Sequence, residues 1–132
     1  MNLKMLKEEA LKARELSYSP YSNFAVGAVL VTKDGRLFHG ANLENASYPL
    51  SICAERTAMF AAKLAGVKAE DVEVLALVAD SPTIVSPCGS CRQVMAEFLL
   101  SETPIVLFTV GGLELVTSVK ELLPFAFSKD NL

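Results

Sequence analysis

Three cysteines and one glutamate are the residues of this sequence whose types and spacing best suit chemistry. Cys88 and Cys91 stand at i and i+3 in the stretch "SPCGSCRQ", so both thiols can project from one face of a single helical turn. A helix starting here would hold both in its first turn, where unpaired N–H groups and the positive end of the helix dipole favour thiolate. Taken alone, the C-x-x-C spacing fits either redox chemistry or metal binding.

The third cysteine favours metal binding. Cys53 stands in "CAER", also at a predicted helix start. Three thiolates from two helix starts can hold a tetrahedral zinc ion and leave its fourth position open, as a catalytic site requires. Glu55 would then be the acid/base partner of a water at that position. Residues i and i+2 of a helix face different ways, so Cys53 must lie at the cap, or Glu55 must curl back across the helix end.

Arg56 and His39 could each modify such a site. Zinc with three thiolates carries a net charge of −1, which disfavours the deprotonation of water. Arg56, next to Glu55, is predicted to hydrogen-bond the sulfurs and withdraw charge from them. His39 is the only histidine. As a fourth ligand it would close the site and favour a structural zinc; otherwise it lies at a strand end.

The first half of the chain predicts a helix, a hairpin and a second helix. Residues 2–16 form an amphipathic pattern whose apolar face is Leu3, Leu6, Ala10, Ala13 and Leu16. Two β-rich runs then flank Asp34-Gly35, a strong hairpin signal. The next helix is expected to begin near Ser51 and to end at Gly66. Because it is apolar on nearly all sides, it is predicted to be buried.

The second half continues with strands on either side of another helix. The apolar stretch "DVEVLALVAD" predicts a central strand. Ser86 is expected to cap the following helix, with Pro87 in its first turn and its end near Leu100. "TPIVLFTV" and "LELVTS" predict two more strands, and "VKELLPFAF" a short helix and tail. The order predicts an α/β fold with one domain over residues 1–132: a three-layer sandwich whose mixed five-stranded sheet carries helices on both faces.

Composition limits the classes of function. The 132 residues suffice for a core without disulfides, and three cysteines cannot all pair within one chain, which favours a reducing compartment. No apolar run approaches the ~20 residues that cross a bilayer, and the start lacks the apolar stretch of a signal peptide. We therefore expect a cytoplasmic protein without a membrane partner. The net charge of −3, with no cluster of Lys or Arg, argues against a nucleic-acid partner.

The combination of "CAER" with "PCGSCRQ" resembles the signature of the cytidine deaminases, C/H-x-E with P-C-x-x-C. "NLENASYPLSICAERTA" resembles the branch of small homotetrameric enzymes that act on free nucleosides, and the resemblance covers nearly the whole chain. It implies the cytidine deaminase fold and one zinc ion per chain on Cys53, Cys88 and Cys91. It also implies hydrolysis of cytidine and deoxycytidine to uridine, deoxyuridine and ammonia, in pyrimidine nucleoside salvage. Glu55 would carry the proton from water to the ring nitrogen N3 and then help to expel ammonia.

The resemblance also implies substrate contacts. Asn42 and Glu44 match the residues that hold the ribose hydroxyls, and Phe24 matches the one that packs on the pyrimidine ring. Ala54, between a metal ligand and the catalytic glutamate, is a further expected contact. A carboxylate that accepts a bond from the 3′-hydroxyl would repel a 3′-phosphodiester. This favours a free nucleoside over DNA or RNA.

Residues at two other places match positions that reach a neighbouring subunit of the homotetramer. Ala46 and Tyr48 match such positions, and Phe127 aligns with the tail aromatic that closes the neighbour's pocket. The family tail usually reads L-L-P-G-A-F, whereas this chain has "LLPFAF". Phe125 thus replaces a small residue, and which phenylalanine closes the pocket stays open.

Three other functions remain to be distinguished. One is a deaminase of another aminopyrimidine, such as blasticidin S, although the "NxENAxY" stretch favours cytidine. Another is a binding module without catalysis, in which zinc only stabilises the fold and replacement of Glu55 would have no functional effect. The third is a thiol–disulfide oxidoreductase using Cys88 and Cys91. It would leave Cys53 and Glu55 without a role, and no strand directly precedes the C-x-x-C.

Overall fold

The computed structural model of the chain describes residues 1–132, and one five-stranded sheet runs through its middle. The helices and strands follow one another as α1 (Leu3–Arg14), β1 (Val26–Thr32), β2 (Leu37–Ala41), α2 (Ala54–Leu64), β3 (Val72–Ala79), α3 (Gly89–Phe98), β4 (Pro104–Thr109), β5 (Glu114–Ser118) and α4 (Val119–Leu122). Short 3-10 turns occupy Tyr48–Leu50, Ala69–Asp71 and Lys129–Asn131. None of the helices is both long and apolar enough to cross a membrane.

The sheet is mixed, as the sequence predicts. Its strand order is β2-β1-β3-β4-β5. β1 pairs antiparallel with β2 and β3, β3 runs parallel to β4, and β5 returns antiparallel to β4. The predicted central strand, β3, is the middle one, and all but one of its residues are buried. The Asp34-Gly35 hairpin is confirmed, with Gly35 at φ +91°, a backbone conformation that glycine adopts without strain.

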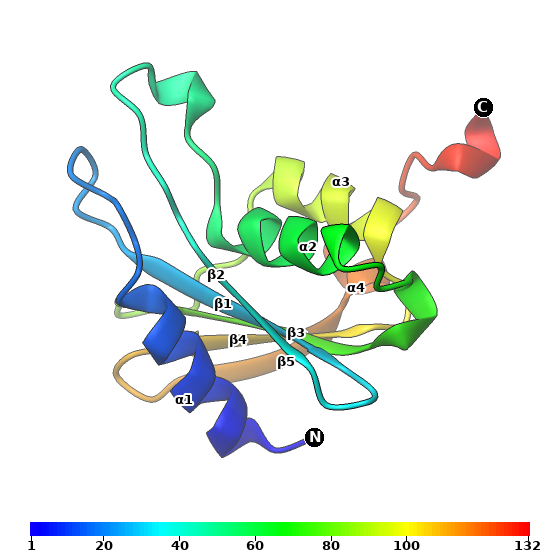
Figure 1. Ribbon diagram of the computed structural model, residues 1–132, viewed down its shortest axis with the longest axis horizontal. Coiled ribbons are helices and arrows are strands. Elements are labelled where there is room, and N and C mark those ends of the chain that lie inside the picture. The colour runs from blue at the N-terminus through cyan, green and yellow to red at the C-terminus, as the bar shows by residue number, and fades with distance from the viewer.

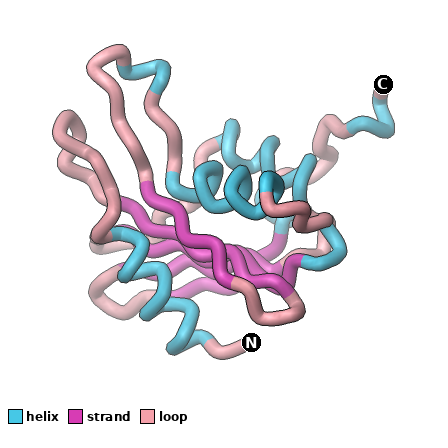
Figure 2. The backbone as a smooth tube through the Cα atoms, viewed as in Figure 1, coloured by secondary structure: helices cyan, strands magenta, loops and turns pink.

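Helices cover both faces of the sheet, so the predicted three-layer sandwich is confirmed (Figures 1 and 2). On one face, α1 packs Leu6 and Ala10 against β1, β3 and β4 in one apolar cluster. On the other, a second cluster joins α2, α3 and α4 to the sheet through residues such as Met59 and Met95. The sheet thus separates two cores, and the one beneath α2 and α3 positions the cysteines.

Both helices that carry cysteines begin later than the sequence suggests. α2 begins at Ala54 and not near Ser51, because Leu43 and Ile52 form an isolated antiparallel bridge that keeps the chain before it extended. α3 begins at Gly89 with Cys88 as its N-cap. Ser86 does not cap it, because its hydroxyl accepts a hydrogen bond from Arg92 instead.

Two predicted apolar faces are also only partly buried. α2 buries one side, but Ala61, Leu64 and Ala65 are exposed, with Leu64 at 90%. The prediction of an all-round buried helix is therefore wrong for the single chain, since the sheet covers one side of α2 only. Leu16 lies beyond the end of α1 and is 68% exposed, so it does not share the inner face of that helix.

The close approach of α2 to β2 depends on Gly40. A Cβ atom at this position would lie 2.3 Å from the carbonyl oxygen of Ala54 and 2.5 Å from the amide nitrogen of Ala58. The Thr57 hydroxyl reinforces the contact, because it accepts from the amide of Ala41 at 3.0 Å and donates to the Ala54 carbonyl at 2.8 Å. The first turn of α2 is thus held directly against the end of β2.

Replacing Gly40 with alanine should therefore force α2 away from the sheet. We expect Gly40→Ala to lower the free energy of unfolding by about 1–3 kcal/mol or more, measured by urea denaturation. Gly111→Ala is the matched control, since a Cβ there meets nothing within 4 Å. Equal stability of the two variants would contradict the close packing described.

Candidate functional site

The three cysteine sulfurs lie together at the beginnings of α2 and α3. The Sγ atom of Cys88 is 4.0 Å from that of Cys53 and 3.4 Å from that of Cys91, and all three sulfurs lie within 4.8 Å of one another. A tetrahedral zinc ion with Zn–S bonds of about 2.3 Å places its sulfurs about 3.8 Å apart. The three residues therefore fit a metal ion of this kind with little adjustment.

The helix starts explain how the sulfurs meet. Cys53 and Cys88 are the N-cap residues of α2 and α3, and each has extended backbone angles. Cys91 lies one turn into α3 and is fully buried. Because Cys53 is a cap and not a helical residue, it can share a site with Glu55 two positions on. Both helix dipoles also point their positive ends toward the sulfurs.

Glu55 lies in the first turn of α2 and lines the same cavity as Cys53 and Cys88. Its side chain is nearly enclosed, with the residue 5% exposed. Burial raises the pKa of Glu55 above its ordinary value. A carboxyl group with a raised pKa beside a metal site can take up and return a proton close to neutral pH, as a general acid/base must.

Arg56 supplies positive charge beside the sulfurs. Its Nη2 lies 3.5 Å from the Sγ of Cys53, and its Nε is buried without any hydrogen-bond partner. The neighbouring thiol of Cys91 lowers the pKa of Cys53 to about 5, against the effect of burial and with further help from Arg56. The same proximity, together with burial, raises the pKa of Cys91. The cluster thus carries anionic sulfur next to a guanidinium.

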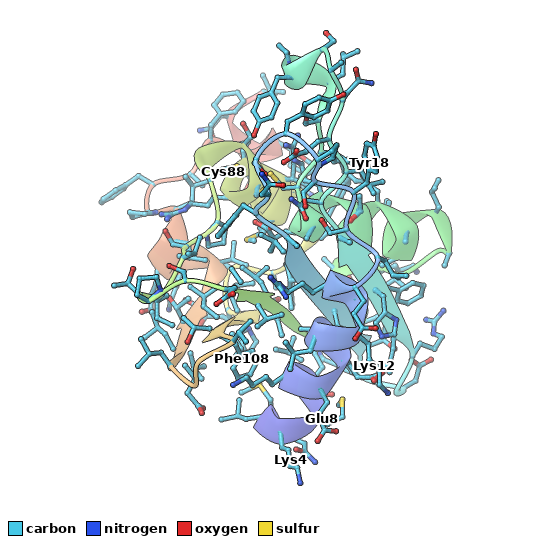
Figure 3. The ribbon with its side chains drawn as sticks, turned by 90° about the vertical axis from the view of Figure 1, so that its left-hand side faces the viewer. Lys4, Glu8, Lys12, Tyr18, Cys88 and Phe108 are labelled. Atoms are coloured by element: carbon cyan, nitrogen blue, oxygen red, sulfur yellow. The ribbon has the colours of Figure 1, made fainter.

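A cavity of about 410 Å³ opens beside the cysteines, a size suited to a small molecule. Of the predicted substrate contacts, Phe24, Asn42, Glu44, Tyr48 and Ala54 line it. They come from three separate segments, since the loop after α1, the loop after β2 and the start of α2 meet here (Figure 1). Cys88, labelled in Figure 3 at the beginning of α3, lines the same cavity.

Two of the predicted substrate contacts lie outside this cavity. Ala46 is exposed on the loop between β2 and α2, and Phe127, 57% exposed, lies in the tail. Neither lines the cavity of its own chain. The loop and the tail both stand clear of the sheet, as Figure 1 shows.

Asn42 and Glu44 also organise the wall on which Phe24 lies. The Asn42 side chain donates to the carbonyl of Phe24 at 2.7 Å and accepts from the amide of Val26 at 2.9 Å. Glu44 accepts from the amides of Tyr21 and Ser22 and from the Ser22 hydroxyl. The bond from that hydroxyl lowers the pKa of Glu44 and keeps its carboxylate ionised.

His39 lies away from the metal centre. Its Nε2 is 3.3 Å from the Oε1 of Glu9 on α1, and it is not among the residues whose ligand atoms cluster. It is therefore a strand residue paired with a helix carboxylate and not a fourth ligand.

Sequence reasoning missed several residues of the cavity. Ser22, Ile52 and Val85 line it, as do residues at the end of β3. Ser22 and Val85 each lie close in the sequence to a predicted site residue, which was the signal available. The end of β3 could be placed only once the sheet order was known.

Comparison with known proteins places the chain among proteins of one activity. The description "Cytidine and deoxycytidylate deaminase zinc-binding region" belongs to a family profile that matches residues 1–107. The chain is 48% identical over 132 residues to a cytidine deaminase of Sporosarcina psychrophila, which covers 100% of this chain and 96% of the relative. It is 49% identical to a cytidine deaminase of Halalkalibacterium halodurans, over 100% of this chain and 98% of the relative.

A solved structure agrees in fold. The crystal structure of cytidine deaminase from Burkholderia pseudomallei superposes with a TM-score of 0.93 at 50% sequence identity. The match covers 96% of this chain and 100% of that chain.

Metal content is the first test of the cysteine cluster. We expect the purified protein to hold one metal ion per chain and Cys91→Ser to lose most of it, because a buried ligand would be removed. Elemental analysis measures both. His39→Ala is the control and should keep its metal; loss of the ion from this variant as well would contradict the assignment of ligands.

Arg56→Gln tests the charge beside the sulfurs. Removal of the guanidinium should lower metal affinity or catalytic rate by about 10–100-fold, as for other groups that hydrogen-bond metal ligands. Chelator competition and steady-state kinetics measure the two quantities. Unchanged values of both would show that Arg56 has no influence on the metal centre.

Proposed function

Because the chain belongs to the family of the cytidine and deoxycytidylate deaminase zinc-binding region, we propose that it hydrolyses cytidine and deoxycytidine to uridine and deoxyuridine with release of ammonia. The chain is an enzyme of the cytidine deaminase type. The observation that carries the proposal is the buried carboxyl group of Glu55 beside three clustered sulfurs in one cavity.

Cys53, Cys88 and Cys91 would hold one zinc ion per chain. When bound, zinc supplies a Lewis acid that activates water at neutral pH. A zinc ion held by these three residues would have a fourth position free for that water, and Cys53, Cys88 and Glu55 all line the cavity.

Glu55 moves the protons of the reaction. Its carboxylate takes the proton of the water that adds to C4 of the pyrimidine and delivers it to the ring nitrogen N3. The second proton of that water leaves with the amino group, so that cytidine and water become uridine and ammonia. Burial supports this role, because a raised pKa lets Glu55 act as base and then as acid.

The walls of the cavity orient the nucleoside. Phe24 packs against the pyrimidine ring, Ala54 contacts the base, and Asn42 and Glu44 bind the ribose hydroxyls. Glu44 is held ionised by its hydrogen bond from Ser22, so a 3′-phosphate would meet a fixed negative charge. The proposed substrate is therefore a free nucleoside, and a role with DNA or RNA is not expected.

The proposed assembly is a homotetramer whose subunits complete one another's sites. Ala46, Tyr48 and Phe127 would reach a neighbouring subunit, and their exposure on two protruding segments supports this. The exposed side of α2, with Leu64, offers apolar surface that a neighbour could cover. We propose that the deaminase domain spans residues 1–132 and includes Phe127 in the tail beyond the residues that the family profile matches.

The cellular role proposed is salvage of pyrimidine nucleosides in the cytoplasm. None of the three cysteines forms a disulfide, so all three are available as metal ligands, as expected in a reducing compartment. The net charge of −3 fits a small-molecule substrate better than a phosphate backbone.

Ammonia release from cytidine by the zinc-loaded protein tests the proposal. We expect turnover by the wild type and a loss of about 10²–10⁴-fold or more in Glu55→Gln, because the variant cannot take up the proton. The zinc content of the variant should stay at one per chain.

The same assay separates the alternatives. Deoxycytidine should also react, and cytidine 3′-monophosphate should not. Turnover of blasticidin S alone would assign a different substrate, and no turnover by a zinc-loaded wild type would indicate a binding module.

The two tail phenylalanines can be distinguished by kinetics. We expect Phe127→Ala to raise the KM for cytidine about 10-fold, the loss of one aromatic contact with the bound base. Phe125→Ala is the matched control and should stay within about 2-fold. Phe125 is fully exposed and has φ +55°. The reverse result would make Phe125 the closing residue.

A further inference from the structure

We propose that Arg92 is a positioning residue that fixes the loop carrying Cys88 and joins it to the C-terminal tail, with Gln93 holding the tail itself. This inference rests on the proposed function for what the tail does, but not for what Arg92 does to the metal centre. Neither residue lines the cavity or belongs to the sulfur cluster.

Each of the three guanidinium nitrogens of Arg92 donates to a different acceptor, and the acceptors belong to two segments of the chain. Its Nε donates to the carbonyl of Pro87 at 2.7 Å, and its Nη2 donates to the Ser86 hydroxyl at 2.8 Å. Its Nη1 donates to the carbonyl of Leu122, the last residue of α4, at 2.7 Å. A planar fork with fixed N–H directions suits such a set of acceptors, whereas the point charge of lysine does not.

Apart from Ile84, which packs against the core beneath α2 and α3, the loop that Arg92 holds has few contacts to fix it. Residues 80–87, between β3 and the N-cap of α3, make no backbone–backbone hydrogen bond. The only hydrogen bonds of that backbone to side chains are from the Thr83 amide to the Ser81 hydroxyl and from Arg92 to the Pro87 carbonyl. Cys88, the next residue, is held on its helix side by the backbone hydrogen bond that its carbonyl accepts from the Arg92 amide, and the Arg92 guanidinium fixes the chain on its other side. Val85 and Ser86 of the same loop also line the cavity.

Gln93 makes the corresponding contact to the tail. Its Nε2 donates to the carbonyl of Phe127 at 2.8 Å. Residues 124–127 form no backbone–backbone hydrogen bond, so this side chain is what holds them by hydrogen bonding. Arg92 and Gln93 are neighbours on α3. One helical turn therefore holds both the loop of residues 80–87 and the tail that is expected to reach another subunit.

Substitutions of Arg92 and of Gln93 should have different effects. Loss of the Arg92 guanidinium should loosen residues 80–87 and the end of α4. Because Cys88 directly follows that loop, the metal centre should be disturbed. Loss of the Gln93 amide frees the tail only, so it should leave the metal centre intact and weaken substrate binding.

The experiment compares Arg92→Lys and Gln93→Ala with Arg36→Lys as the matched control. Arg36 is paired with Asp34 at the exposed hairpin, which lies at the opposite end of β2 from the chain that leads to Cys53. Each protein is loaded with Zn²⁺ for the rate of metal transfer to a colorimetric chelator, and with Co²⁺ for its sulfur-to-metal absorption bands. Steady-state kinetics with cytidine then give kcat and KM separately.

We expect Arg92→Lys to transfer its zinc about 10-fold faster than wild type and to shift the cobalt bands, while Arg36→Lys changes neither. Gln93→Ala should keep the wild-type transfer rate and cobalt bands and raise the KM several-fold. Wild-type metal transfer and cobalt bands in Arg92→Lys would overturn the proposal. Equally fast transfer in Gln93→Ala would overturn the division of roles.

Two further features keep the test decisive. If Arg92→Lys does not fold, Ser86→Ala removes one acceptor and should speed zinc transfer by about 2–3-fold, the effect of losing one such hydrogen bond; an unchanged rate would count against Arg92. The metal measurements use no substrate. A wild type that does not act on cytidine would therefore refute the proposed function without deciding the role of Arg92.

Discussion

The meeting of two helix N-termini at one edge of the sheet is the arrangement on which the rest of the site depends. α2 reaches this edge because Gly40 and Thr57 allow it to pack directly on β2, and α3 reaches it from the end of β3. Ligands of α/β proteins commonly bind beyond the carboxyl ends of parallel strands, and the cavity here includes the end of β3. Because β1 runs antiparallel to β3, its beginning lies at the same edge and brings Phe24 to the cavity.

Charge balance follows from that arrangement. The three sulfurs are too close together for all of them to be thiolates without strong mutual repulsion, which the two helix dipoles and the Arg56 guanidinium only partly offset. Glu55 lies beside them in a position that burial makes expensive for a carboxylate. A dication bound by the sulfurs would relieve both, which supports the proposal that the cluster and the buried carboxyl group form one functional unit.

The local features of the site could be predicted from the sequence, whereas its long-range supports could not. C-x-x-C and the hairpin are set by neighbouring residues, and the alternation and apolar runs predicted a mixed sheet between helices. The cap of α3 was predicted at Ser86 but lies at Cys88. The late start of α2 depends on the pairing of Leu43 with Ile52, and no local pattern shows that pairing. The three acceptors of Arg92 come from a loop and from the end of α4, so its contacts likewise appear only in the folded chain. The exposure of the outer side of α2 was not predicted, because the apolar sequence of an alanine-rich helix does not show which surface would cover each of its sides.

X-ray absorption at the zinc edge of the purified, zinc-loaded protein tests the central claim most directly. Three helix-start thiolates with an open fourth position predict three sulfur neighbours at about 2.3 Å and one oxygen neighbour at about 2.0 Å. Four sulfurs, or a histidine nitrogen in the fourth place, would mean a closed structural metal. Fewer than three sulfurs would mean that the two helix starts do not share one ion.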